Sequence, residues 1–167
     1  LALVTGCLTS STSDSSSEAA SIYPVPDAYT AHYTSANTIY TSGDYVKIKA
    51  HGVPNHNSPY FNTSDARYEA YNGSNSSYFS NPNHISTFNY VFQIPITPNT
   101  VVTASQTQTE MGPIGVAING VPLFNQYAAG RVALSSNEYN TFDQYDGHPG
   151  YDNDYHYHWQ PYYLTSM

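Results

Sequence analysis

Residues 88–96 constrain the fold more than any other segment, because every second side chain there is aromatic or aliphatic. A period of two places alternate side chains on the same face of a strand. The segment therefore predicts a core strand. Residues 45–50 predict a second, half-buried strand, since apolar residues there alternate with two lysines. The residues expected on the buried faces are Phe88, Tyr90, Phe92, Ile94 and Ile96 of the first strand, and Val46, Ile48 and Ala50 of the second.

Residues 114–118 and 121–124 predict a hairpin, because they flank Asn119-Gly120, a favoured two-residue turn in which both positions take positive φ. Pro122 lacks an N–H donor, which predicts an edge position for the second strand. Residues 100–107 are rich in β-branched side chains and predict a strand that pairs with 88–96. Helix signals are weak, with one or two turns expected at 125–129 and 136–139. The predicted fold class is all-β, an antiparallel sandwich or barrel with long loops.

The chain of 167 residues predicts one domain, and its composition limits the partners. Charged residues make up 10%, and the net charge is −8 with only four Lys and Arg. Such a surface disfavours nucleic acid and anionic membranes as partners. Tyr, Asn, Ser and Thr replace charge, which is typical of proteins outside the cell. We therefore expect an exported protein at the cell surface or in the extracellular space.

Residues 1–40 predict an extended N-terminal arm, and residues 41–167 the β domain. The segment that ends at Cys7 resembles the end of a bacterial lipoprotein signal, and a Ser-rich spacer at 9–21 follows it. Cys7 is therefore a candidate for lipidation, and the alternative is a short strand with a buried thiol. Tyrosines at 23–40 favour an interface with a second copy of the chain, or else a solvated linker. N-x-[S/T] triplets make three asparagines candidates for a covalent glycan: Asn62, Asn72 and Asn75.

Residues 143–158 hold four carboxylates and three of the seven histidines. In a strand, His156 and His158 project from one face and Tyr155 and Tyr157 from the other. Imidazoles beside carboxylates suit zinc or copper, whereas an acidic loop suits calcium. A purely structural hydrogen-bond cluster without a cofactor is the alternative.

Several blocks of the sequence resemble one bacterial family. They are G-P-I-G-V-A-I-N-G-V-P-L-F-N-Q-Y-A-A-G at 112–130, T-F-D-Q-Y-D-G-H-P at 141–149, Y-H-Y-H at 155–158, and the earlier H-G-V-P-N-H-N-S-P-Y at 51–60 and N-P-N at 81–83. Together they are similar to the YHYH-domain family of secreted and lipid-anchored proteins, over roughly residues 44–164. The resemblance implies a β-rich exported domain and names no reaction. Aligned residue by residue, it makes five residues candidate ligands, Asp143, His148, His156, His158 and, from a distant loop, His56, with Asp152 and Asp154 as partners that orient the imidazoles. Members usually continue with an apolar stretch and a second Y-H-Y-H, so either this sequence is truncated at its C-terminal end or the missing half is not needed for what the protein does.

Two functions fit these observations. The first is an exported structural protein that self-assembles through its arm into a cell-surface or extracellular fibre, as a homo-oligomer or filament. The second is a metal-binding or metal-dependent module, anchored to the membrane only by a lipid on Cys7, that acts on a small extracellular ligand. No nucleophile motif or phosphate-binding loop is present, so the sequence favours a protein without catalytic activity over an enzyme.

Overall fold

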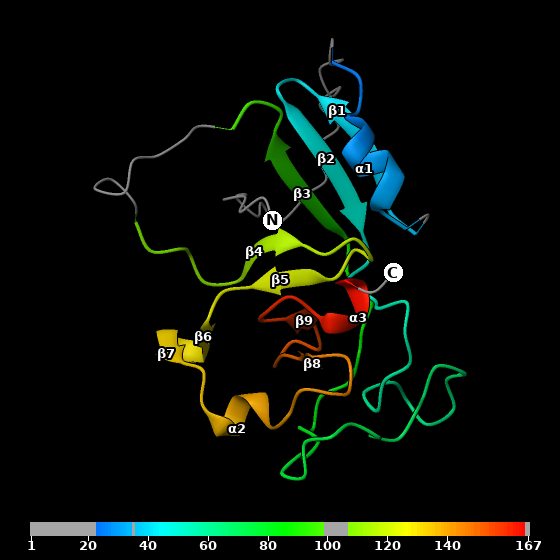
Figure 1. The fold of residues 1–167 in the computed structure, drawn as a ribbon, viewed down its shortest axis with the longest axis vertical. Coiled ribbons are helices and arrows are strands. Elements are labelled where there is room, and N and C mark those ends of the chain that lie inside the picture. The colour runs from blue at the N-terminus through cyan, green and yellow to red at the C-terminus, as the bar shows by residue number, and fades with distance from the viewer. Residues whose placement is uncertain (1–22, 35, 99–106, 166–167) are drawn as a thin grey trace.

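A computed structural model describes residues 23–34, 36–98 and 107–165, and within them the chain is built mainly from short strands (Figure 1). This confirms the all-β prediction, and the sheets of the described residues do not close into a barrel. The first sheet has the order β1-β2-β3, the second the order β4-β5-β9-β8, and β6 pairs with β7. The strands are β1 Thr38–Ser42, β2 Tyr45–Ala50, β3 Tyr90–Pro95, β4 Pro113–Val116, β5 Pro122–Phe124, β6 Tyr127–Ala128, β7 Val132–Ala133, β8 Gly147–Pro149 and β9 Tyr155–Tyr157.

The first sheet forms as the alternating pattern predicts. β2 buries Val46, Ile48 and Ala50 and turns its lysines outward, and it pairs antiparallel with β3 so that Ile48 lies opposite Phe92. These four residues form a small apolar core. Gly43, at φ 54°, makes the tight turn between β1 and β2. The strand predicted at 100–107 lies almost wholly outside the described residues, and the neighbour that β3 has in the described sheet is β2.

The described part of the predicted arm is not an extended tether. It contains the helix α1 Asp27–His32 and the start of β1, which crosses the boundary expected after residue 40. Tyr29 and Tyr33 pack against the first core, and the Tyr33 hydroxyl donates to the Val116 carbonyl at 3.3 Å. The tyrosines expected at an interface with another copy therefore pack, in part, on their own domain, because α1 brings them over the sheet.

The predicted hairpin forms between β4 and β5, but two of its details were wrong. The Gly120 N–H donates to the Ala117 carbonyl at 2.8 Å, and of the turn pair only Gly120, at φ 86°, has positive φ. The Ala117 N–H also donates to the Val121 carbonyl at 2.9 Å, so the connection is a three-residue loop, 118–120, that ends in the left-handed Gly120, rather than a two-residue loop. β5 is also an interior strand, between β4 and β9. Pro122 is tolerated there because β5 meets β9 through a single pair, Leu123 and Tyr157.

β8 and β9 form a second hairpin, in which His148 lies opposite His156 and Gly147 opposite Tyr157. Gly147 has a packing role, because a Cβ at this position would collide with the ring of Tyr155. Tyr155 and Tyr157 are fully buried in a second apolar core together with Tyr60 and Val121. Figure 1 shows this hairpin below β5, beside the helices α2 Ser136–Tyr139 and α3 Tyr162–Thr165.

The short helix predicted at 136–139 is confirmed as α2. The helix predicted at 125–129 is wrong, because Tyr127 and Ala128 form β6 and a 3-10 turn, η2, follows at Ala129–Arg131. Residues 51–66 form a loop, as predicted, without a named strand. Within the described residues, no helix combines the length and the apolar character that crossing a membrane requires.

Candidate metal centre

The strand β9 separates two groups of polar side chains, one on each of its faces. Tyr155 and Tyr157 point to one side, and His156 and the following His158 point to the other, as a strand requires. His148, opposite His156 on β8, joins the histidine side. The sequence therefore placed the two histidines of the H-x-H pair correctly, and the hairpin supplies the third.

The three imidazoles converge through their Nε2 atoms. His148 Nε2 lies 3.2 Å from His156 Nε2, and His156 Nε2 lies 3.2 Å from His158 Nε2. One nitrogen from each ring lies within 4.8 Å of the other two. Ligand nitrogens at the usual zinc distance of about 2.0–2.1 Å lie about 3.3 Å apart at the corners of a tetrahedron. The triad could therefore hold a metal ion with little movement.

The tautomers of the three rings are fixed by the partners of Nδ1. His156 Nδ1 faces the Asp154 carbonyl at 2.8 Å and His158 Nδ1 faces the Asn125 carbonyl at 2.6 Å, so both must donate. His148 Nδ1 lies 2.7 Å from Thr141 Oγ1, whose only hydrogen goes to the Glu138 carbonyl at 2.7 Å. His148 therefore donates as well.

With all three protons on Nδ1, each neutral ring presents the lone pair of Nε2 to the others. Two such lone pairs at 3.2 Å repel each other unless a cation lies between them. Hydrogen bonds from the outer nitrogen are also the arrangement that orients metal-binding histidines in proteins. The geometry therefore suits a set of metal ligands better than a hydrogen-bonded chain of imidazoles.

Burial keeps these histidines neutral. His148 and His156 are only 3% and 5% exposed, and burial lowers the pKa of His148 to about 2 and that of His156 to about 3. Burial also lowers the pKa of His158. The Phe124 ring stacks on His156 with a centroid distance of 4.0 Å, and Phe142 stacks on His158 at 5.6 Å. An apolar wall around a metal site limits the access of water.

Asp143 does not join the triad, contrary to its prediction as a ligand. Its carboxylate accepts hydrogen bonds from the Ser58 hydroxyl at 2.6 Å and the Tyr155 hydroxyl at 2.8 Å, and from the N–H groups of Tyr145 and Gly147. These four hydrogen bonds hold the carboxylate on the tyrosine side of β9, away from the triad. Burial raises the pKa of Asp143 to about 6, and the donors limit this rise.

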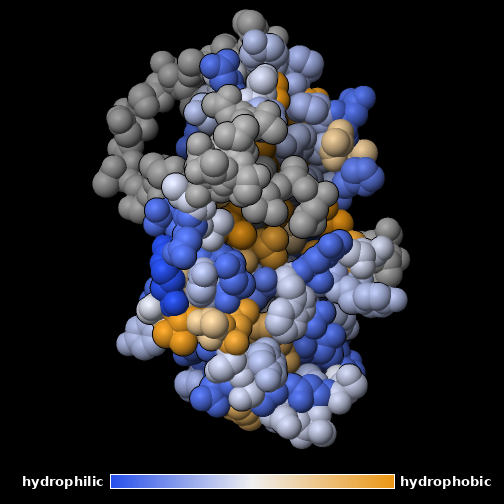
Figure 2. Space-filling view, turned by 60° about the vertical axis from the view of Figure 1, so that its left-hand side comes forward, coloured by the Kyte–Doolittle hydropathy of each residue, from blue (hydrophilic) through white to orange (hydrophobic). Residues whose placement is uncertain are grey.

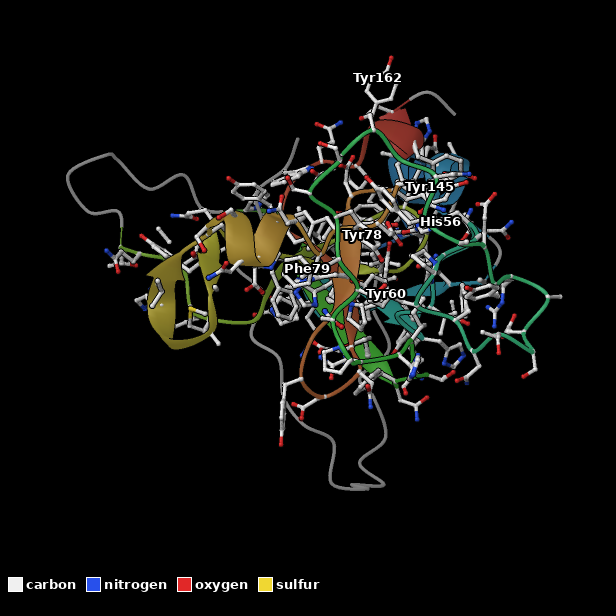
Figure 3. The ribbon with its side chains drawn as sticks, turned by 90° about the horizontal axis from the view of Figure 1, so that it is seen from below. His56, Tyr60, Tyr78, Phe79, Tyr145 and Tyr162 are labelled. Carbon is white, nitrogen blue, oxygen red and sulfur yellow. The ribbon has the colours of Figure 1, made fainter. Side chains whose placement is uncertain are left out.

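His56 is also on the tyrosine side and not among the triad. Its Nε2 lies 2.9 Å from the Tyr157 hydroxyl and its Nδ1 2.7 Å from the Asn57 carbonyl, while its ring stacks on Tyr145 at 4.1 Å (Figure 3). The Tyr157 hydroxyl in turn accepts from the Asn119 amide at 3.1 Å. Asp143 and His56 thus belong to a structural hydrogen-bond cluster, which was the alternative that the sequence left open.

The two predicted orienting carboxylates differ in their roles. Asp154 orients His156 through its backbone carbonyl, and its carboxylate lies farther away, 3.8 Å from His156 Nδ1. Asp152 is exposed, and the outer nitrogens of the triad hydrogen-bond to other groups. The sequence reading missed Thr141, the carbonyl of Asn125, and Glu138, whose Oε1 lies 3.7 Å from His148 Nε2. The acidic character of Glu138 was visible, but its place beside His148 depends on the turn after α2.

The three asparagines that are candidates for glycosylation differ in exposure. Asn62 and Asn72 are exposed, whereas the Asn75 amide donates to Asn140 Oδ1 at 3.0 Å. Cys7 and the spacer at 9–21 lie outside the described residues. Attachment of a sugar or a lipid stays a prediction.

Fold and site together define a class of protein: a β-rich domain built around a strand in which tyrosines and histidines alternate, with a histidine triad on one face. The family model of the YHYH proteins matches residues 91–167, which confirms the resemblance seen in the sequence blocks. The match runs from β3 to the end of the chain and includes the triad and Asp143. It is narrower than the span of 44–164 expected from the blocks, and His56 lies before it. No curated protein and no solved structure matches the chain.

Proposed function

We propose that this protein is a metal-binding domain that holds one transition-metal ion between His148, His156 and His158. The observation that supports this best is the convergence of three Nε2 lone pairs on rings whose Nδ1 protons are all tied to acceptors. A structural histidine cluster would alternate donors and acceptors between its rings. Here each ring turns an Nε2 lone pair towards the others, and all of these are acceptors. A bound cation would remove the repulsion between them.

Zinc or copper fits the donor set better than calcium does. Calcium prefers six to eight oxygen ligands, whereas neutral imidazoles suit zinc and copper. Asp143, the carboxylate that could have favoured calcium, is occupied on the other side of β9. The proposal concerns binding, and it assigns no reaction to the ion.

We expect the metal-free protein to take up one equivalent of Zn²⁺ or Cu²⁺ and no Ca²⁺ in isothermal titration at pH 7. His156→Ala should weaken Zn²⁺ binding by more than the roughly 10–100-fold that loss of an outer-shell partner costs, because His156 Nε2 is the atom that lies next to both other ligands. The exposed His84 lies outside the triad, so His84→Ala is the matched control and should bind like the wild type. Absence of uptake by the folded wild-type protein would refute the proposal.

Self-association in the extracellular space remains a proposal about the N-terminal residues. Since α1 and β1 pack on their own domain, an arm that reaches a second copy has to use residues 1–22. On the described surface, Tyr151 and Tyr162 are 93% and 79% exposed (Tyr162 points outward in Figure 3). Figure 2 shows hydrophobic residues in separate patches among hydrophilic ones on the face that it presents.

We expect deletion of residues 1–22 to abolish assembly, as measured by light scattering and electron microscopy of the purified protein. Metal stoichiometry should stay unchanged, because the triad and its partners all lie beyond residue 124. Deletion of residues 1–40 is a poorer test, since it removes α1 and part of β1. Assemblies of unchanged size in the shorter chain would contradict the arm hypothesis without affecting the metal proposal.

A further inference from the structure

Glu138 lies at the edge of the histidine triad, and it was not among the predicted ligands. Its Oε1 is 3.7 Å from His148 Nε2, and its side chain is 34% exposed, whereas His148 is 3% exposed. The carboxylate therefore approaches the converging nitrogens from the solvent side. Among the described residues, Glu138 forms no ion pair with Lys or Arg, and its carboxylate faces the neutral imidazole of His148.

We infer that Glu138 is the fourth ligand of the metal, which closes the site on its solvent side and makes it selective for divalent ions. This inference rests on the proposed function, since it concerns the same ion. It adds an oxygen ligand from α2 to three nitrogens from the β8–β9 hairpin.

A single turn of chain fixes both nitrogens of His148. The Glu138 carbonyl accepts from the Thr141 hydroxyl at 2.7 Å and from the Thr141 N–H at 2.9 Å. The same hydroxyl accepts from His148 Nδ1, and the Glu138 carboxylate faces His148 Nε2. Within residues 138–141, the Thr141 hydroxyl thus accepts the Nδ1–H of His148, and the Glu138 carboxylate lies beside Nε2 on the other side of the same ring. An anion beside a lone pair is repelled unless a cation lies between them.

The distances describe part of one coordination shell. Three contacts join the four ligands in sequence: 3.7 Å from Glu138 Oε1 to His148 Nε2, then 3.2 Å to His156 Nε2 and 3.2 Å to His158 Nε2. Neighbouring ligands of tetrahedral zinc lie about 3.3 Å apart. The carboxylate is thus close to that spacing from His148, but it lies outside the group of atoms within 4.8 Å of one another, so its side chain has to turn towards His156 and His158 when the ion binds.

The charge of the ligands determines which ion is preferred. Three neutral imidazoles leave a divalent ion with its full charge beside the rings of Phe124 and Phe142, where charge is costly. One carboxylate reduces that net charge to one. A monovalent copper ion gains less from the carboxylate, and it needs only the imidazoles. Glu138 therefore favours Zn²⁺ over Cu⁺.

Glu138→Gln tests the inference, because it removes the charge and keeps the size of the side chain. We expect Zn²⁺ affinity, measured by chelator competition, to fall about 100-fold or more. Cu⁺ affinity should change by less than about 3-fold. The intense visible bands of tetrahedral Co²⁺ should weaken when water replaces the carboxylate. Glu110→Gln is the matched control, because the Glu110 side chain is 98% exposed, and it should match the wild type.

Glu138→Ala provides a second variant, in which added formate should restore part of the Zn²⁺ affinity and the Co²⁺ bands. A residue that only supports α2 would not be rescued in this way. If the wild type binds Zn²⁺ and Glu138→Gln binds it equally well with the same Co²⁺ spectrum, the fourth-ligand inference is wrong and the triad proposal survives. If the wild type binds no metal, the proposed function itself is wrong.

Discussion

Replacement of Asp143 by Ala should lower the free energy of unfolding by about 3–5 kcal/mol, a large part of the 5–15 kcal/mol typical of a domain. Asp143 is 4% exposed and accepts four hydrogen bonds, from two side chains and two backbone N–H groups. Its loss leaves these buried donors without an acceptor, and each such donor costs about 1–3 kcal/mol, in part relieved by rearrangement. The donors come from the loop at Ser58, the turn at 145–147 and β9, so the variant should loosen all three.

Urea denaturation followed by circular dichroism measures this effect. Asp152→Ala is the matched control, because Asp152 is exposed, and we expect a change below about 0.5 kcal/mol. Asp143→Asn should fall between the two, since the amide keeps the size but turns an N–H group towards donors. A loss below 1 kcal/mol for Asp143→Ala would show that the cluster on the tyrosine side of β9 does not hold the fold together.

The metal-free protein should lose stability steeply as the pH falls below 6.5. Burial lowers the pKa of His56 to about 4, that of His148 to about 2 and that of His156 to about 3, and it also lowers the pKa of His158. In the unfolded chain these histidines take up protons near their ordinary pKa of 6.5, so unfolding binds protons below that pH. Stability therefore increases as the pH rises through this range.

Asp143 acts in the opposite direction, because its raised pKa lets the native state hold a proton that the unfolded chain releases between pH 6 and 3.8. The net uptake on unfolding near pH 5 is roughly two to three protons, which corresponds to about 3–4 kcal/mol per pH unit. Thermal melts of chelator-treated protein between pH 7 and pH 4.5 measure this slope.

Bound Zn²⁺ should shift the acid transition to lower pH, since protons then compete with the ion for His148, His156 and His158. The shift should be absent in His156→Ala, which provides the control for an effect of zinc elsewhere on the protein. A flat melting temperature between pH 7 and pH 5 in the metal-free protein would mean that the histidines are not buried as the structure has them.

Local sequence patterns predicted those parts of the fold that depend on local periodicity. The alternation at Val46, Ile48 and Ala50 fixed which face of β2 is buried, and Asn119-Gly120 correctly located the reversal between β4 and β5. The placement of His156 and His158 on one face followed from the same period of two. Such predictions succeed because strand geometry alone decides which side chains share a face.

His148, a predicted ligand, does join the triad, but the surroundings of the three histidines could not be predicted, because they depend on which distant segments meet. Asp143 is only five residues from His148, yet the turn between them carries it to the other side of β9. His56 meets Tyr157 across 101 positions of the chain. Glu138 approaches His148 only because α2 ends in a turn closed by Thr141. The edge position predicted from Pro122 failed for a similar reason, since the sequence does not show that β9 comes to lie beside β5.

Because the two faces of β9 carry different side chains, the register of the strand decides whether the imidazoles or the phenols lie on a given side. A slip by one residue would exchange phenols and imidazoles, bringing His156 and His158 to Asp143 and sending the tyrosines to the metal side. The hydrogen bond from Tyr155 to Asp143 holds this register, because a slip would break it, and so it keeps the imidazoles on the side of the proposed metal site. For protein engineering this separates two tasks: His156 and His158 can be varied to change the proposed site, while Tyr155 and Tyr157 have to be kept to hold the strand in place.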